Sequence, residues 1–104
     1  MRITYSTATV LCALARGHGY GFEILDVTGL PAGTVYPILR RLDDGGLVRS
    51  SWEAARIAHA EGRPPRRNYR ITGEGQRLAA EAIARYPALA SLFGETSGGQ
   101  PEPA

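Results

Sequence analysis

The sequence contains no lysine, one cysteine and no apolar run long enough to cross a membrane. With Cys12 alone, the chain cannot close a disulfide within itself, which suits a reducing compartment, so we expect a cytoplasmic protein. The longest apolar run, residues 8–15, is far short of the about 20 residues of a membrane helix. We expect it to form a buried helix rather than an export signal. A chain of 104 residues forms one domain. Large enzymes, multidomain receptors and membrane transporters are therefore excluded.

All twelve basic residues are arginine, whose planar guanidinium suits phosphates and guanine edges. A GC-rich genome would also favour arginine, so the distribution is more informative than the total. The segment from Arg56 to Arg70 holds five arginines and one acid, Glu61, in a chain whose formal net charge is +2. Such a local basic segment predicts an anionic partner.

The spacing of apolar residues predicts three helices in the first half of the chain. They cover about residues 7–15, 21–28 and 33–44, and a glycine follows each. In the third helix the predicted buried stripe is Val35, Ile38, Leu39 and Leu42. Because Pro37 lacks an N–H, which is tolerated only within about the first turn, we expect this helix to begin near Gly33 or Thr34, with Tyr36 and Pro37 at its tip.

The second half of the chain predicts shorter elements. They are a strand over 48–57, a turn over 59–65, a strand over 66–71, a helix after the N-cap Thr72 that is kinked or ended by Pro87, and one or two helical turns over 88–93. We expect Trp52 to be a structural anchor between the strand and the helices rather than a platform on which a ligand stacks. The whole order is mainly α with a two-stranded β-ribbon, which is typical of a winged helix-turn-helix. We expect residues 1–72 to form the DNA-binding unit, 73–93 a C-terminal dimerisation helix, and 94–104 a disordered tail.

Two segments are candidates for contact with nucleic acid. Tyr36 and Arg40 lie four residues apart on the third helix and so share a face, and Arg41 lies beside them. In residues 62–67, prolines stiffen a turn that carries three arginines, which can follow a phosphate backbone or enter a minor groove. The alternatives are a generic amphipathic helix with solvated arginines and a solvated hairpin loop.

Catalytic and metal-binding patterns are lacking. We find no nucleophile with a paired base and no phosphate-binding loop, and His18 and His59 are far apart without neighbouring ligands. The glycines of residues 17–21 do not follow a strand, which excludes a dinucleotide fingerprint. We therefore expect no enzymatic activity, no cofactor and no metal.

Several motifs resemble the PadR family of bacterial transcriptional regulators. They include Tyr-Gly-Phe-Glu-Ile at 20–24, Gly-Thr-Val-Tyr-Pro at 33–37 and Gly-Arg-Pro-Pro-Arg-Arg-Asn-Tyr at 62–69. The similarity covers about residues 8–78 and is closest to compact members with a short C-terminal helix. It implies a winged-helix homodimer that binds double-stranded operator DNA, usually as a repressor, and that small aromatic or lipophilic effectors release in some members. The alternative is a winged-helix protein-interaction module, or a co-regulator, that binds no operator itself.

The candidate site residues come partly from the two basic segments and partly from this resemblance. The expected DNA contacts are Tyr20, Thr34, Tyr36, Pro37, Arg40, Arg41, Arg63, Pro64, Arg66 and Arg67. The resemblance also implies a dimer interface on the first and last helices, made by Leu11, Leu14, Leu78, Ala82, Ile83, Tyr86 and Leu89.

Overall fold

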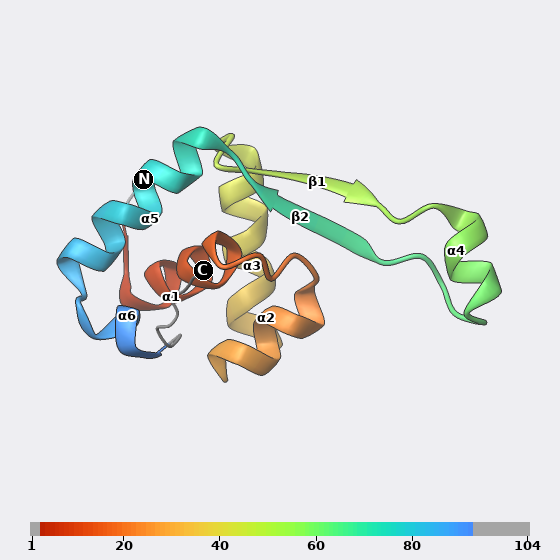
Figure 1. The fold of residues 1–104 in the computed structure, drawn as a ribbon, viewed down its shortest axis with the longest axis horizontal. Coiled ribbons are helices and arrows are strands. Elements are labelled where there is room, and N and C mark those ends of the chain that lie inside the picture. Colours follow the sequence, from red (N-terminus) through yellow and green to blue (C-terminus); the bar gives the residue numbers. More distant parts are fainter. Residues whose placement is uncertain (1–2, 93–104) are drawn as a thin grey trace, which may run out of the picture.

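The computed structural model describes residues 3–92, so the predicted disordered tail over 94–104 lies outside the described residues. The elements follow the order α1 (Tyr5–Ala15), α2 (Gly21–Thr28), α3 (Ala32–Asp44), β1 (Val48–Trp52), α4 (Ala55–Ala60), β2 (Arg67–Ile71), α5 (Gly73–Arg85) and α6 (Ala88–Leu92). The helices other than α4 form a body, and the ribbon β1–β2 leaves it as an arm with α4 at the far end (Figure 1). The fold is a winged helix-turn-helix, as the sequence predicts.

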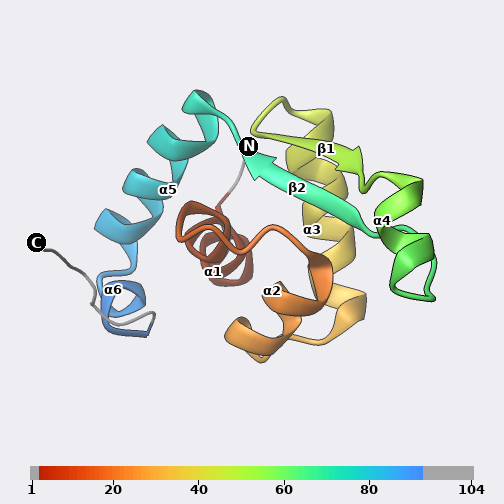
Figure 2. The same ribbon diagram turned by 45° about the vertical axis from the view of Figure 1, so that its right-hand side comes forward.

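Helix α1 is the centre of the body. Every residue from Thr7 to Leu14 is buried, and α1 contacts α2, α3 and α5. Figure 2 shows α1 between α5 on one side and α2 and α3 on the other. The apolar stripe of α3 closes the core with Leu11 and Ile24, and Leu39 and Leu42 are 0% exposed. Removal of these side chains from water is the main source of stability.

Helices α2 and α3 form the helix-turn-helix. At the start of α2, the Glu23 carboxylate accepts hydrogen bonds from the backbone N–H groups of Gly19 and Tyr20 at 3.1 and 3.3 Å. Helix α3 begins at Ala32, directly after Pro31. The predicted start at Gly33 or Thr34 is therefore one or two residues late, and Pro37 lies in the second turn of α3 rather than near its tip.

The segment from β1 to β2, which we call the wing, differs most from prediction. Strand β1 pairs antiparallel with β2 from Val48–Ile71 to Trp52–Arg67. It ends at Trp52 rather than at residue 57, and α4 occupies residues expected to be strand and turn. Alanine-rich sequence favours helix, and α4 buries Ala58. The expectation that Trp52 is a structural anchor between the strand and the helices is also wrong, because its side chain is 65% exposed.

The C-terminal helices pack on the far side of α1. The Thr72 side chain caps α5 by accepting the N–H of Gly75 at 3.1 Å, and the chain turns at Pro87 before α6, as expected. The buried residues Ala8, Cys12, Ala82 and Leu89 form a second apolar cluster. Four of the residues predicted for the dimer interface are thus buried within the single protomer. They are Leu11, Leu14, Ala82 and Leu89.

Candidate nucleic-acid interface

The exposed face of α3 carries the predicted reading residues. Tyr36 is 44% exposed, Pro37, Arg40 and Arg41 are exposed, and Thr34 is half-buried. The opposite stripe of the helix is buried, so packing in the core fixes which side chains face outward. Helix α3 therefore presents an aromatic ring and two guanidinium groups to solvent.

Contact with α2 fixes the ring of Tyr36. A Cβ atom at Gly21 would lie 2.7 Å from Cε1 and 2.8 Å from Cζ of Tyr36, and closer still to its hydroxyl. Only glycine leaves room for the ring, which lies against the first turn of α2. Helices α2 and α3 therefore come into close contact at Gly21 and Tyr36, in addition to the core that they share.

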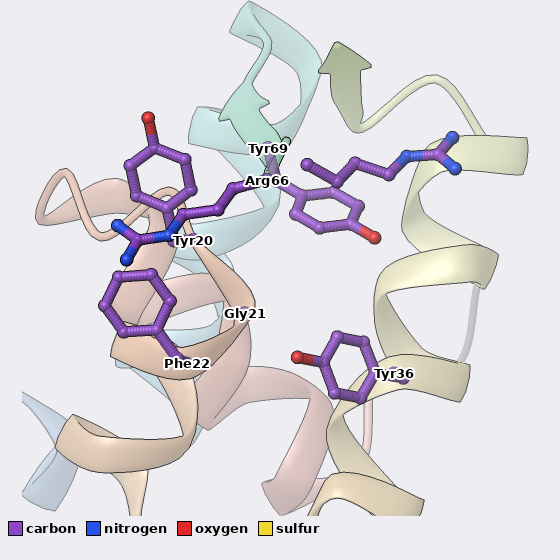
Figure 3. A pocket seen from close by; sticks show the side chains of 7 residues that line it. Tyr20, Gly21, Phe22, Tyr36, Arg66 and Tyr69 are labelled. Atoms are coloured by element: carbon purple, nitrogen blue, oxygen red, sulfur yellow. The ribbon is translucent and has the colours of Figure 1, made fainter. Parts of the chain in front are cut away.

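A hollow of about 200 Å³ lies between α2, α3 and the first half of β2. Four aromatic rings and two arginines surround it, from Tyr20, Phe22, Tyr36, Tyr69, Arg66 and Arg67, together with Gly21 (Figure 3). Burial raises the pKa of Tyr69, so its phenol stays neutral. A hollow with cationic groups and aromatic walls suits the phosphates and sugars of a nucleic-acid strand.

Arg66 reaches back from the wing onto α2. Its Cζ lies 4.7 Å from the ring centre of Phe22 and 5.9 Å from that of Tyr20, and the two rings stack with centres 5.6 Å apart. A backbone hydrogen bond from Tyr69 N–H to the Gly19 carbonyl, 2.7 Å long, ties the same two segments together. Cation–π contact holds the guanidinium in place while leaving its charge available.

Arg67 lines the same hollow and is held by β1 and by the end of α3. Its Nη2 donates to the Ser50 hydroxyl at 2.8 Å, and that hydroxyl donates to the Asp43 carboxylate at 2.9 Å. The Arg67 guanidinium also lies 5.4 Å from the Trp52 ring centre. A second hollow of about 160 Å³, lined by Tyr36, Arg40, Asp43, Arg67 and Tyr69, continues the first. Tyr36 and Arg40 therefore share one surface, as their spacing predicts.

Arg63 is placed differently from the other predicted contacts. Its Nη1 and Nη2 donate to the two carboxylate oxygens of Glu53 at 2.6 and 3.0 Å, and its side chain is 21% exposed. Hydrogen bonding to Arg63 lowers the pKa of Glu53, which therefore stays ionised at neutral pH. Pro64, next to Arg63, is exposed.

The structure thus brings Tyr20, Tyr36, Arg66 and Arg67 around one hollow, adds Arg40 through the second, and leaves Arg41 exposed on α3. Sequence reasoning missed Phe22 and Tyr69 as lining residues. Tyr20 and Phe22 flank Gly21 at the start of α2, and this aromatic pair is a sequence signal that could have pointed to Phe22 as a lining residue. Their meeting with Arg66 depends on a long-range contact, for which the sequence carries no local signal.

Among residues 3–92 there is no group of three or more His, Cys, Asp or Glu side chains that could hold a metal ion. Over the same residues, the longest helices have 13 residues, and none is long and apolar enough to span a bilayer.

Comparison with known proteins agrees with this geometry. The PadR-like transcription factor of Bacteroides fragilis is 25% identical, with a TM-score of 0.65, over 80% of this chain and 81% of that chain. A PadR family regulator of Eggerthella lenta is 28% identical, with a TM-score of 0.61, over 89% and 87% of the two chains.

BpsR of Bordetella bronchiseptica shares the fold at 22% identity and a TM-score of 0.66, over 92% of this chain and 69% of that chain. The DNA binding of BpsR is regulated by 6-hydroxynicotinic acid. No protein with a curated description is similar enough to count as a match. Residues 10–81 match the PadR-like family of transcriptional regulators, whose members are regulators and not enzymes. The chain belongs to the PadR-like family of transcriptional regulators.

Proposed function

We propose that the protein is a repressor that binds operator DNA as a homodimer, with α3 of each protomer in a major groove and the wing beside it. The observation that carries this proposal is the continuous surface of Tyr36, Arg40, Arg66 and Arg67, built by α3 and the wing around the two hollows. A two-fold dimer would read a pseudo-palindrome with half-sites about one helical turn apart. With this function the protein works in the cytoplasm, and residues 1–72 act as its DNA-binding unit.

The proposed dimer surface lies on the far side of the body from α3. Tyr5 is 49% exposed and packs edge to face on Tyr86, with ring centres 5.4 Å apart, while Leu78 and Ile83 are half-buried. The N-terminal end of α1, which supplies Tyr5, thus joins the predicted helix 73–93 in this surface. Light scattering should give a dimer for the wild-type chain and a weaker one for Ile83→Asp, which would put a charge into the interface. A monomeric wild-type protein would contradict this part of the proposal.

Arginine–phosphate contacts should supply most of the affinity. With about 6–10 phosphate contacts per dimer, affinity should fall by about 10³–10⁵ between 50 and 200 mM salt. Arg41→Ala and Arg66→Ala should each weaken binding to every sequence and lower the salt slope by about 1 per lost contact.

Fluorescence anisotropy with a labelled random-sequence duplex pool measures this. Arg77→Ala is the matched control, since Arg77 is an exposed arginine of α5 that pairs with Glu74 outside the hollows. Binding that ignores salt, or wild-type affinity in both Arg41→Ala and Arg66→Ala, would favour a protein-interaction module instead.

A small-molecule effector is the finer part of the proposal. The similarity to BpsR supports a planar aromatic ligand, and the dimer cleft beside α1 and α5 is the place we propose for it. Such a ligand releases DNA only if it binds the DNA-incompetent dimer more tightly. Titration of 6-hydroxynicotinic acid against the DNA complex tests one candidate, and an unchanged anisotropy would exclude that compound.

A further inference from the structure

The wing contains a carboxylate in the middle of its basic segment. Glu53 follows β1 directly, at the point where the two strands diverge toward α4, and its side chain is only 9% exposed. A negative charge beside a phosphate backbone should weaken DNA binding by repulsion. Its position therefore needs a physical reason that outweighs this cost.

The hydrogen bonds of Glu53 supply that reason. Its carboxylate accepts two bonds from the Arg63 guanidinium, at 2.6 and 3.0 Å, and one from the backbone N–H of Arg66 at 3.2 Å. Its own N–H donates to the Arg66 carbonyl at 2.8 Å. One residue thus joins the exit of β1, the loop after α4 and the entry of β2.

Arg63 extends this network into α4. Its backbone N–H donates to the Ala58 carbonyl at 3.1 Å, and Ala58 is 1% exposed. Its Nε is buried and makes no hydrogen bond within the described chain, while both Nη atoms are directed at Glu53. The pair therefore fixes the small helix against the ribbon, and the Arg63 guanidinium is already engaged.

Arg66, the next arginine along the chain, is held at its backbone and at its guanidinium. Glu53 binds the backbone of Arg66, and Phe22 and Tyr20 hold its guanidinium. We propose that Glu53 and Arg63 are positioning residues for DNA binding: Glu53 sets the path of the wing so that Arg66 meets the phosphate backbone, and Arg63 acts through Glu53. This inference rests on the proposed function. It makes Arg66 a phosphate contact and Arg63 a residue that does not contact DNA itself.

Two alanine variants that each remove one negative charge from the wing separate positioning from simple electrostatics. Glu53 is bonded as described, whereas Glu61 is exposed at the end of α4. Electrostatics alone predicts that Glu53→Ala and Glu61→Ala both tighten binding to the labelled random duplex pool at low salt. Positioning predicts that Glu53→Ala weakens binding and lowers the salt slope by about 1 per misplaced Arg66, while Glu61→Ala does not.

Two substitutions of Arg63 distinguish positioning from direct phosphate contact. Arg63→Lys keeps the charge but loses the two-pronged geometry that the carboxylate needs. We expect it to weaken binding like Glu53→Ala, and we expect Glu53→Ala/Arg63→Ala to be no weaker than Glu53→Ala alone. The reciprocal pair Glu53→Arg/Arg63→Glu has the wild-type net charge and should recover part of the affinity lost in either single swap. Circular dichroism and urea unfolding should show that the helical body of each variant stays folded.

Each result has a separate meaning. Wild-type protein that fails to bind the duplex pool at low salt overturns the proposed function, and the inference with it. Wild-type binding together with a Glu53→Ala variant that binds at least as tightly as the wild-type protein overturns the inference alone. Full affinity in Arg63→Lys overturns the role of Arg63, because a retained charge would then suffice.

Discussion

The body and the wing are held together by different forces. Nearly all the buried apolar side chains of residues 3–92 belong to the body, with Leu11, Val35, Leu39 and Leu42 at 0% exposure. Beyond the base of the ribbon, the wing of that same described chain buries one hydrophobic residue, Ala58. Its shape depends on the Glu53–Arg63 pair, on ladder hydrogen bonds and on rings stacked with guanidinium groups.

This difference separates stability from recognition. Burial of apolar area is strong and does not depend on direction, whereas partly exposed ion pairs contribute about 0–1 kcal/mol each. We expect the free energy of unfolding to depend on the buried side chains of the body, and DNA affinity to depend on the exposed face of α3 together with the wing. Substitutions in either region test whether the two properties are separable.

The largest expected effect is in the core of the body. Leu39→Ala should lower the free energy of unfolding by about 2–5 kcal/mol, because it leaves a cavity where the side chain is fully buried. Urea unfolding followed by circular dichroism measures this loss. In the wing, Ser51→Ala changes an exposed side chain and should cost less than about 0.5 kcal/mol. Equal losses in the two variants would remove the distinction between body and wing.

A smaller effect is expected where α5 meets the base of the ribbon. A Cβ at Gly75 would collide with the Leu47 carbonyl oxygen and lie 2.6 Å from Cγ1 of Ile71. Gly75→Ala should therefore cost about 1–3 kcal/mol through overpacking. Gly73→Ala, two residues earlier, meets no atom within 4 Å and is the control. Calorimetry should show a lower Tm for the first variant only, and a shared shift would indicate a general helix effect instead.

The same contrast explains how much of the fold could be predicted from the sequence. Helix α3 and its buried stripe follow from apolar spacing, and Thr72 and Pro87 mark the boundaries of α5 as predicted. Helix α4 was missed because residues 54–60 have no clear periodicity. Two interactions of Arg63 hold α4 in place. Its N–H donates to the Ala58 carbonyl, and its guanidinium pairs with Glu53, ten residues earlier in the chain.

The candidate site was predictable in its parts but not in its assembly. The basic residues of α3 and of the wing could be read as a pattern, and Tyr36 and Arg40 do share a surface. The sequence pattern predicts the same role, DNA contact, for Arg63 and Arg66. In the structure, however, Arg63 pairs with the Glu53 carboxylate and Arg66 stacks on Phe22. Which partner an arginine meets depends on tertiary contacts between α2, β1 and β2, and local sequence does not encode them.

The smallest expected effect is a local response of the wing to acid. Hydrogen bonding to Arg63 lowers the pKa of Glu53 below its value in an unfolded chain. A depressed carboxyl pKa stabilises the folded state above the unfolded pKa, and this contribution is lost as pH falls through the folded pKa. Acid should therefore loosen the wing as the pH falls through the lowered pKa of Glu53. Nuclear magnetic resonance of the Glu53 carboxyl carbon should show a midpoint that rises in Arg63→Gln, since the main donor is gone. An identical midpoint in both proteins would mean that the pair does not form in solution, and the wing would then need another explanation for its shape.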